Sequence, residues 1–305
     1  MINALRAHWP EYLIEGWALG TFMISAGLVA TLLGAPASPV HRALSEPMWR
    51  QAAGGLAMGL TAIALIHSGW GKRSGAHMNP AVTLTFLRLG KIRPWDALFF
   101  VTAQVIGGMS GVLLVAALAG HAFSDPPVSY AATMPGPAGR AAAFAAEFTI
   151  SAVLMLTVLS LTASARLARY TGLIVGCLVA LYITFESPLS GMSMNPARSL
   201  ASAAPGMLWR DLWIYLSAPF LGMLAGAQVF LMAAGARLVV CAKLLHPLGV
   251  RCIHCGYEPH AAARGASAAV QPGSARAYAQ DGFPFAHPLP CDATVTSFGA
   301  VLIAV

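Results

Sequence analysis

Two copies of an Asn-Pro-Ala tripeptide are the residues of this sequence best placed to act on a solute. They lie in two similar segments, SGAHMNPAVTL at 74–84 and SGMSMNPARSL at 190–200, which are identical at seven of eleven positions. Asn is a good helix N-cap and Pro fits the first helical position, so each tripeptide predicts the start of a helix. The six residues are Asn79, Pro80, Ala81, Asn195, Pro196 and Ala197.

Each tripeptide opens an apolar stretch about half as long as a membrane span, over 79–89 and 195–204. A short helix of this kind is tolerated in a bilayer only where it is buried in protein or lines a water-filled cavity. Two such helices meeting end to end would oppose cations with the positive ends of their dipoles. The two Asn side-chain amides would then donate hydrogen bonds to a passing solute. This chemistry is selective passage of neutral molecules, and we expect no enzyme activity and no cofactor.

The elements that position these residues are apolar spans. Charged residues make up 10% of the chain, against about 25% in soluble domains, and a span needs about 20 residues. Two candidate spans carry one acid each, Glu15 and Glu147. We predict an all-α membrane protein with six spans, at 12–33, 51–71, 97–124, 141–165, 170–185 (the shortest) and 212–236.

The repeat predicts how the spans are arranged. Each tripeptide follows the second span of a three-span half, and an odd number of spans inserts the second half with the opposite orientation. Such inverted repeats place their functional site near the midplane. Glycines four residues apart in five spans, such as Gly16 and Gly20, indicate close helix contacts. We expect a first repeat at 1–120, an extracellular loop at 121–140, a second repeat at 141–240 and a disordered tail at 241–305.

The distribution of basic residues predicts orientation. Eleven of the 18 Lys and Arg residues lie on the side of both termini and five on the other, the last two being in the far tail. The positive-inside rule therefore places both termini in the cytoplasm of a multi-pass protein of the plasma or inner membrane. The net charge of +7 thus reflects topology, and we expect the lipid bilayer rather than nucleic acid as partner.

Together, the two tripeptides, the Arg after the second one and the six spans in two inverted halves resemble the aquaporin and aquaglyceroporin (major intrinsic protein) family, over roughly residues 11–236. The resemblance implies an aquaporin-like fold with re-entrant half-helices, a homotetramer, and exclusion of ions by the half-helix dipoles and an Arg. It places Arg198 in the selectivity constriction. The other implied positions are Ile183, Met192 and either Met58 or Gly59.

These positions depart from the familiar sets of the family, which are an aromatic with His for water and two aromatics with Gly for glycerol. Ser199, Ala203 and Tyr215 resemble water channels, whereas Leu216 leans the other way. An apolar lining beside one Arg predicts a channel for water that tolerates small neutral solutes such as urea, ammonia, peroxide or glycerol. A solute-coupled transporter or a non-conducting structural membrane protein with this fold are the alternatives.

Three further features allow more than one interpretation. His77 could donate to solutes approaching the pore, or only to a backbone carbonyl. Glu15 and Glu147 are interpreted as acceptors for the re-entrant loops of their own halves, rather than as proton-relay acids. Cys252 and Cys255 have the spacing of half a zinc site, which His246, His254, His260 or Cys291 could complete. Because no second cysteine pair exists, we interpret them as reduced thiols in a tail and predict no metal.

Overall fold

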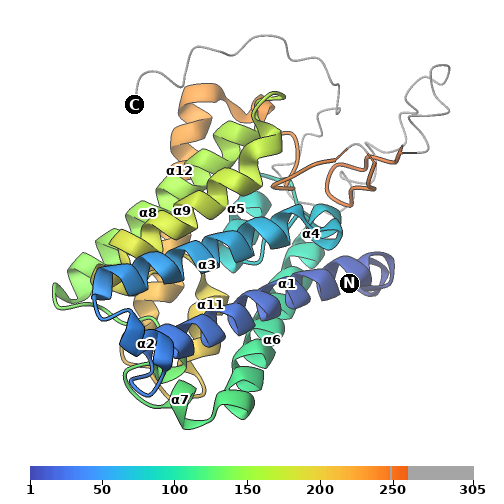
Figure 1. Ribbon diagram of the computed structural model, residues 1–305. Helices are drawn as coiled ribbons and strands as arrows, with labels where there is room; N and C mark the ends of the chain where they lie inside the picture. Colours follow the sequence, from blue (N-terminus) through green and yellow to red (C-terminus); the bar gives the residue numbers. More distant parts are fainter. Residues whose placement is uncertain (248, 260–305) are drawn as a thin grey trace, which may run out of the picture.

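A bundle of long helices forms the body of the protein (Figure 1). The computed structural model describes residues 1–247 and 249–259, so the tail beyond 259, with His260 and Cys291, lies outside the described residues. The described residues contain helices and no strand, which confirms the predicted all-α class. The long helices are α1 (Ile2–Gly34), α3 (Pro47–His67), α6 (Pro94–Ala119), α8 (Gly139–Thr162), α9 (Thr171–Phe185) and α12 (Leu212–Ala234).

Five of these helices, counting the short turn before α9, have the length and apolar composition needed to cross a membrane. The exception is α3, whose 21 residues would span about 32 Å at 1.5 Å per residue. Its polar Arg50 and Gln51 and its glycines make it less apolar than the rest. The shortest predicted span, at 170–185, is one of the five.

The two halves of the chain build matching sets of helices. Within each half the first long helix packs along the last, α1 on α6 and α8 on α12, and α3 packs along α9 between the halves. Glycines allow this proximity. A Cβ added to Gly20 would lie 2.9 Å from Gly107 O, and one added to Gly107 would overlap Gly16 O.

Two half-length helices lie inside the bundle, α5 (Pro80–Arg88) and α11 (Pro196–Ala203). With their caps they cover 79–89 and 195–204, the stretches expected from the sequence. The remaining short helices connect the long ones: α2 (Pro39–Ala43), α4 (Gly69–Ser74), α7 (His121–Ser124), α10 (Ser187–Ser190) and the 3₁₀ turns η1 (Ser129–Ala131), η2 (Ala168–Tyr170) and η3 (Ala236–Leu238).

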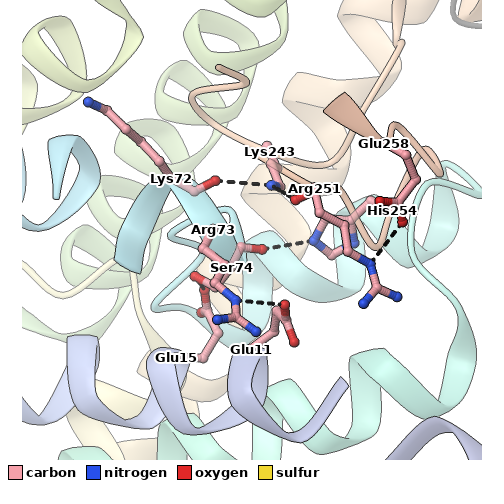
Figure 2. Close-up of polar contacts among 9 residues, drawn as sticks. All are labelled: Glu11, Glu15, Lys72, Arg73, Ser74, Lys243, Arg251, His254 and Glu258. Carbon is pink, nitrogen blue, oxygen red and sulfur yellow. Dashed lines mark hydrogen bonds and ion pairs between the residues drawn. The ribbon is translucent and has the colours of Figure 1, made fainter. Parts of the chain in front are cut away.

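The segment after α12 is ordered where a disordered tail was expected. Residues 239–247 and 249–258 contain only turns, bends and irregular backbone, yet Lys243, Cys252 and His254 are buried. The segment runs back to the end of the bundle that holds the N-terminus and α4 (Figure 1), which we call the terminal face. Figure 2 shows it docked there, with Lys243 and His254 reaching the backbone of α4. The expectation failed for 241–259 because composition did not reveal these specific contacts.

Candidate functional site

The two half-helices begin at the centre of the bundle, each capped by its Asn. Asn79 Oδ1 accepts a hydrogen bond from Ala81 N at 2.8 Å. Asn195 Oδ1 accepts from Ala197 N at 3.1 Å and from Arg198 N at 3.2 Å. With Pro at the first helical position in both, the tripeptides form the caps predicted from their residue types. The positive ends of both helix dipoles therefore point to the same place.

The two asparagines also bind each other's loops. Asn79 Nδ2 donates to Met194 O, and Asn195 Nδ2 donates to Met78 O, both at 2.7 Å. An amide carries two N–H groups. Within the described part of the chain each amide uses one of them in this way, so the other can face a solute. Both side chains line the central cavity.

Glu15 and Glu147 hold the two loops that lead into the half-helices. Both carboxylates are fully buried, and a buried charge needs several hydrogen bonds to offset its desolvation. This is the arrangement expected for loop-supporting acids. Glu15 accepts from Ser74 Oγ (2.7 Å), His77 N (3.0 Å), Met78 N (2.7 Å) and Gln104 Nε2 (2.8 Å), and Glu147 accepts from Ser190 Oγ, Ser193 N and Met194 N, each at 2.7 Å.

The loops share an unusual backbone conformation. Ala76 and Met78 have φ of 55° and 49°, and their repeat counterparts Met192 and Met194 have 51° and 53°. A non-glycine residue in this left-handed region is strained by about 1–2 kcal/mol. The carboxylate bonds to Met78 N and Met194 N hold the strained residues in place. Sequence reasoning missed the donors Ser74 and Ser190, although both lie at identical positions of the repeat.

A central cavity of about 480 Å³ runs along the half-helix junction. On α3 its lining extends from Pro47 to Ile66. These residues are nineteen positions apart, or about 29 Å of helix, close to the thickness of the hydrocarbon core. Side chains of α1, such as Phe22 and Leu33, also line it. The described lining residues include no Asp or Glu.

The four predicted constriction residues all line this cavity: Met58, Ile183, Met192 and Arg198. Gly59, the alternative to Met58, lies instead against α9, where an added Cβ would be 2.5 Å from Gly176 O. Arg198 Nη1 is buried and has no hydrogen-bond partner in the described part of the chain. A guanidinium carries five N–H donors, and Arg198 as a residue lines the cavity beside the apolar Met58, Ile183 and Met192.

His77 lines the end of the cavity nearest the terminal face. Its Nε2 donates to Ala242 O at 2.7 Å, and its Nδ1 lies 3.1 Å from Thr83 Oγ1. Both ring nitrogens thus have protein partners, which favours the backbone-carbonyl interpretation over donation to solutes.

The residues that follow Arg198 face away from the cavity. Ser199 Oγ lies 2.6 Å from Ser193 Oγ and 2.7 Å from Thr133 Oγ1, so it ties the loop at 121–140 to α11. Buried Tyr215 donates to Ser190 O, whereas Leu216 is exposed on the outer surface. Ser199 and Tyr215 therefore support the loops, and none of these three residues lines the central cavity.

Glu186 and His254, at opposite ends of the bundle, have shifted pKa values. Burial raises the pKa of Glu186, which follows α9 at the face opposite the terminal one, to about 7. Burial, and then the charge of His77, lower the pKa of His254 at the terminal face to about 3. At neutral pH His254 is therefore uncharged, and its ring stacks on the His77 ring.

Comparisons with known proteins agree on one family. The model of the major intrinsic protein family matches residues 9–230. Aquaporin NIP6-1 of Arabidopsis thaliana is 38% identical over 171 residues, which are 55% of this chain and 54% of that protein. Aquaporin NIP1-2 of the same plant is 34% identical over 221 residues, 70% of this chain and 71% of the relative.

The chain matches a smaller share of some relatives. It spans 62% of the length of a probable NIP-type aquaporin of Nicotiana alata, at 34% identity. The fold is similar to the X-ray structure of the aquaglyceroporin from Plasmodium falciparum. That match has a TM-score of 0.59 at 22% identity and covers 73% of this chain and 95% of the other.

Proposed function

Because the chain belongs to the major intrinsic protein family, we propose that it is a passive transmembrane channel for water and small neutral solutes such as urea, ammonia, peroxide or glycerol. The observation that carries the proposal is the lining of the cavity. Two half-helix N-termini, with Asn79 and Asn195, and Arg198 line it. Cations are opposed by the dipoles and the Arg, while a neutral solute finds donors along the path.

The apolar neighbours of Arg198 support tolerance for solutes other than water. Met58, Ile183 and Met192 offer a solute dispersion contacts without hydrogen bonds. A site built of polar groups rejects a molecule that leaves those groups unpaired, whereas an apolar wall discriminates weakly. Selectivity then depends on size and on the single guanidinium.

The same lining supports a channel over the alternative of an ion-coupled transporter. A coupling-ion site needs acidic or carbonyl ligands along the path, and the described lining has no Asp or Glu. The buried acids Glu15 and Glu147 serve the loops. We place both termini in the cytoplasm, as the basic residues indicate, so the terminal face is the cytoplasmic one. A homotetramer is proposed from the family alone.

Osmotic swelling and shrinkage of liposomes containing the protein test this proposal. The parent is expected to speed water efflux over empty liposomes, and glycerol and urea should enter faster than through bare lipid. Arg198→Val should increase leakage of protons or cations, because a fixed charge is lost at the narrowest part. The matched control is Arg210→Val, at an exposed residue of the same half.

Each outcome distinguishes one alternative. Permeability equal to that of empty liposomes would leave only a structural role. Saturable uptake that depends on an ion gradient would indicate a transporter. Flux of water without any solute would limit the channel to water.

A further inference from the structure

The segment after α12 lies across the terminal end of the cavity. Its residue Leu244 lines the cavity and donates its N–H to Gly75 O at 3.2 Å. The neighbouring Ala242 O accepts from His77 Nε2 at 2.7 Å. Further along, His254 Nε2 donates to Ser74 O at 2.9 Å (Figure 2). These contacts fall on the last residue of α4 and on the loop that leads from it to the first half-helix, so the segment covers the mouth of the proposed pore.

The segment packs against the bundle with little regular structure of its own. Residues 239–247 and 249–258 form no helix or strand, although Val239, Ala242, Leu244 and Ile253 are buried in the main core. Short stretches of this kind often add a disulfide or a metal to such packing. The segment also lies beyond the residues matched by the family model, which end at 230.

Four soft ligands gather in this segment: Cys241, His246, Cys252 and Cys255. Their ligand atoms all lie within 4.8 Å of one another. The Sγ atoms of Cys241 and Cys252 are 3.4 Å apart, and His246 Nε2 is 3.2 Å from Cys255 Sγ. A tetrahedral zinc ion with bonds of about 2.3 Å to sulfur and 2.0–2.1 Å to nitrogen separates its ligands by about 3.6–3.8 Å. The separations of 3.4 and 3.2 Å lie a few tenths of an ångström below these values, and the 4.8 Å limit for the whole set lies above them.

The local backbone brings the two cysteines of the Cys-x-x-Cys pair together. Gly256, directly after the pair, has φ of +75°, a conformation that glycine adopts without strain. Its N–H donates to Cys252 O at 3.0 Å, and Cys252 N donates to Tyr257 O at 2.9 Å. This tight turn places both thiols on one side, while the His246 ring packs against the Tyr257 ring.

The charge around the cluster favours a metal over neutral thiols. Zn²⁺ with three thiolates and a neutral imidazole carries one negative charge. Lys243 is 2% exposed and has no ion pair in the described part of the chain. Its Nζ donates to Lys72 O and to Arg251 O, the carbonyl just before Cys252 (Figure 2). A buried ammonium without an acid needs a counter-charge, and a zinc thiolate centre supplies one.

A disulfide is the competing explanation for two of the cysteines. The 3.4 Å between the Sγ atoms of Cys241 and Cys252 is far longer than an S–S bond of about 2.05 Å. A disulfide would also leave His246 and Cys255 without a role. Three thiols and an imidazole with no oxygen ligand select zinc among the common divalent ions.

We propose that Cys241, His246, Cys252 and Cys255 bind one Zn²⁺, and that the ion fixes the segment across the cytoplasmic mouth and restricts flow. The sequence alone favoured free thiols because the third and fourth ligands, Cys241 and His246, follow no spaced motif. Zinc binding stands on the cluster itself, whereas the restriction of flow rests on the proposed channel function.

The first experiment measures zinc in the full-length protein, purified in detergent from zinc-supplied cells without a polyhistidine tag. We expect one ion per chain, and thiolate-to-metal absorption bands after replacement by Co²⁺. The double variant Cys252→Ser/Cys255→Ser should lose at least the ~10- to 100-fold in affinity that loss of an outer-shell partner costs. Cys177→Ser, on the exposed surface of α9, should keep the ion.

Two results would overturn the metal site. One is a parent protein that takes up no zinc and has all five cysteines reactive. The other is a parent with two fewer reactive thiols, which would indicate a disulfide. If the double variant does not give monodisperse helical protein, removal and re-addition of zinc in the parent make the same measurement.

The second experiment measures water permeability of liposomes with a membrane-permeant zinc chelator. Removal of zinc should raise permeability severalfold, re-addition should reverse the rise, and the double variant should respond to neither. Protein that binds zinc but conducts equally with and without it would refute the closure of the mouth. Protein that binds zinc and never conducts would refute the channel function while the zinc site stands.

Discussion

Replacing Glu147 by Gln tests whether a buried carboxylate holds the second loop in its strained shape. One carboxylate oxygen accepts from Ser190 Oγ and Ser193 N, and the other accepts from Met194 N, all at 2.7 Å. A Gln oxygen can replace only one of them. If it keeps the first two bonds, its NH₂ group faces Met194 N–H, donor against donor.

The cost follows from these bonds. An orphaned buried N–H costs about 1–3 kcal/mol, and two charge-assisted bonds weakened to neutral ones lose about 1 kcal/mol each. The neutral amide is easier to bury, which recovers part of the loss. The net destabilisation is about 2–4 kcal/mol, or roughly 3–6 °C in melting temperature for a chain of this size. Met192 and Met194, left-handed in the parent, should relax and disturb the constriction.

The assay compares the apparent melting temperature in detergent and the water permeability of liposomes. Glu46→Gln, at an exposed residue before α3, is the control and should match the parent in both. A Glu147→Gln protein that melts within about 2 °C of this control and conducts normally would refute the role given to the carboxylate.

Three other experiments test separate features. Gly107→Ala should destabilise the protein by about 3 kcal/mol, because the added Cβ would overlap Gly16 O. Gly69→Ala, where the added Cβ lies in open space, should leave stability unchanged. Equal melting temperatures for the two variants would show that close helix packing at Gly107 is unimportant. The pKa of Glu186 rises from 4.5 to about 7 on folding, so the protein should lose up to about 3 kcal/mol as pH rises from 4.5 past 7. Melting at pH 5 and 8 should show this loss in the parent and less of it in Glu186→Gln. Met58→Trp should lower glycerol flux more than water flux, because the ring fills the cavity; equal reductions in the liposome assay would place Met58 away from the limiting constriction.

Much of the core fold could be predicted because it depends on short-range rules. Asn79 and Pro80 predicted a helix start from their own residue types, and the structure has α5 beginning there. The acids Glu15 and Glu147 were interpretable as a pair because the repeat related them. The roles of such residues can be inferred from their neighbours in the sequence and from the repeat, without the contacts that distant segments make after folding.

Other features depend on contacts between distant segments and were not predictable. Counting along the chain could not choose between Met58 and Gly59, because one residue of uncertainty in the turn after α3 rotates the choice by 100° around the helix. The bond between Thr133 and Ser199 joins a loop to a helix 66 residues away. Composition gave no sign that 241–259 would be ordered, since its buried residues follow no period.

The reciprocal bonds from Asn79 to Met194 O and from Asn195 to Met78 O also limit how the protein can move. Rocking one repeat against the other would have to break both bonds at once, in a buried setting where each loss leaves an unpaired carbonyl. The two bonds therefore oppose motion at the point around which an alternating-access cycle would turn. They favour passage of a solute without a change of global shape. For the proposed channel, flux should then grow in proportion to the gradient, and regulation at the mouths of the path would leave this junction intact.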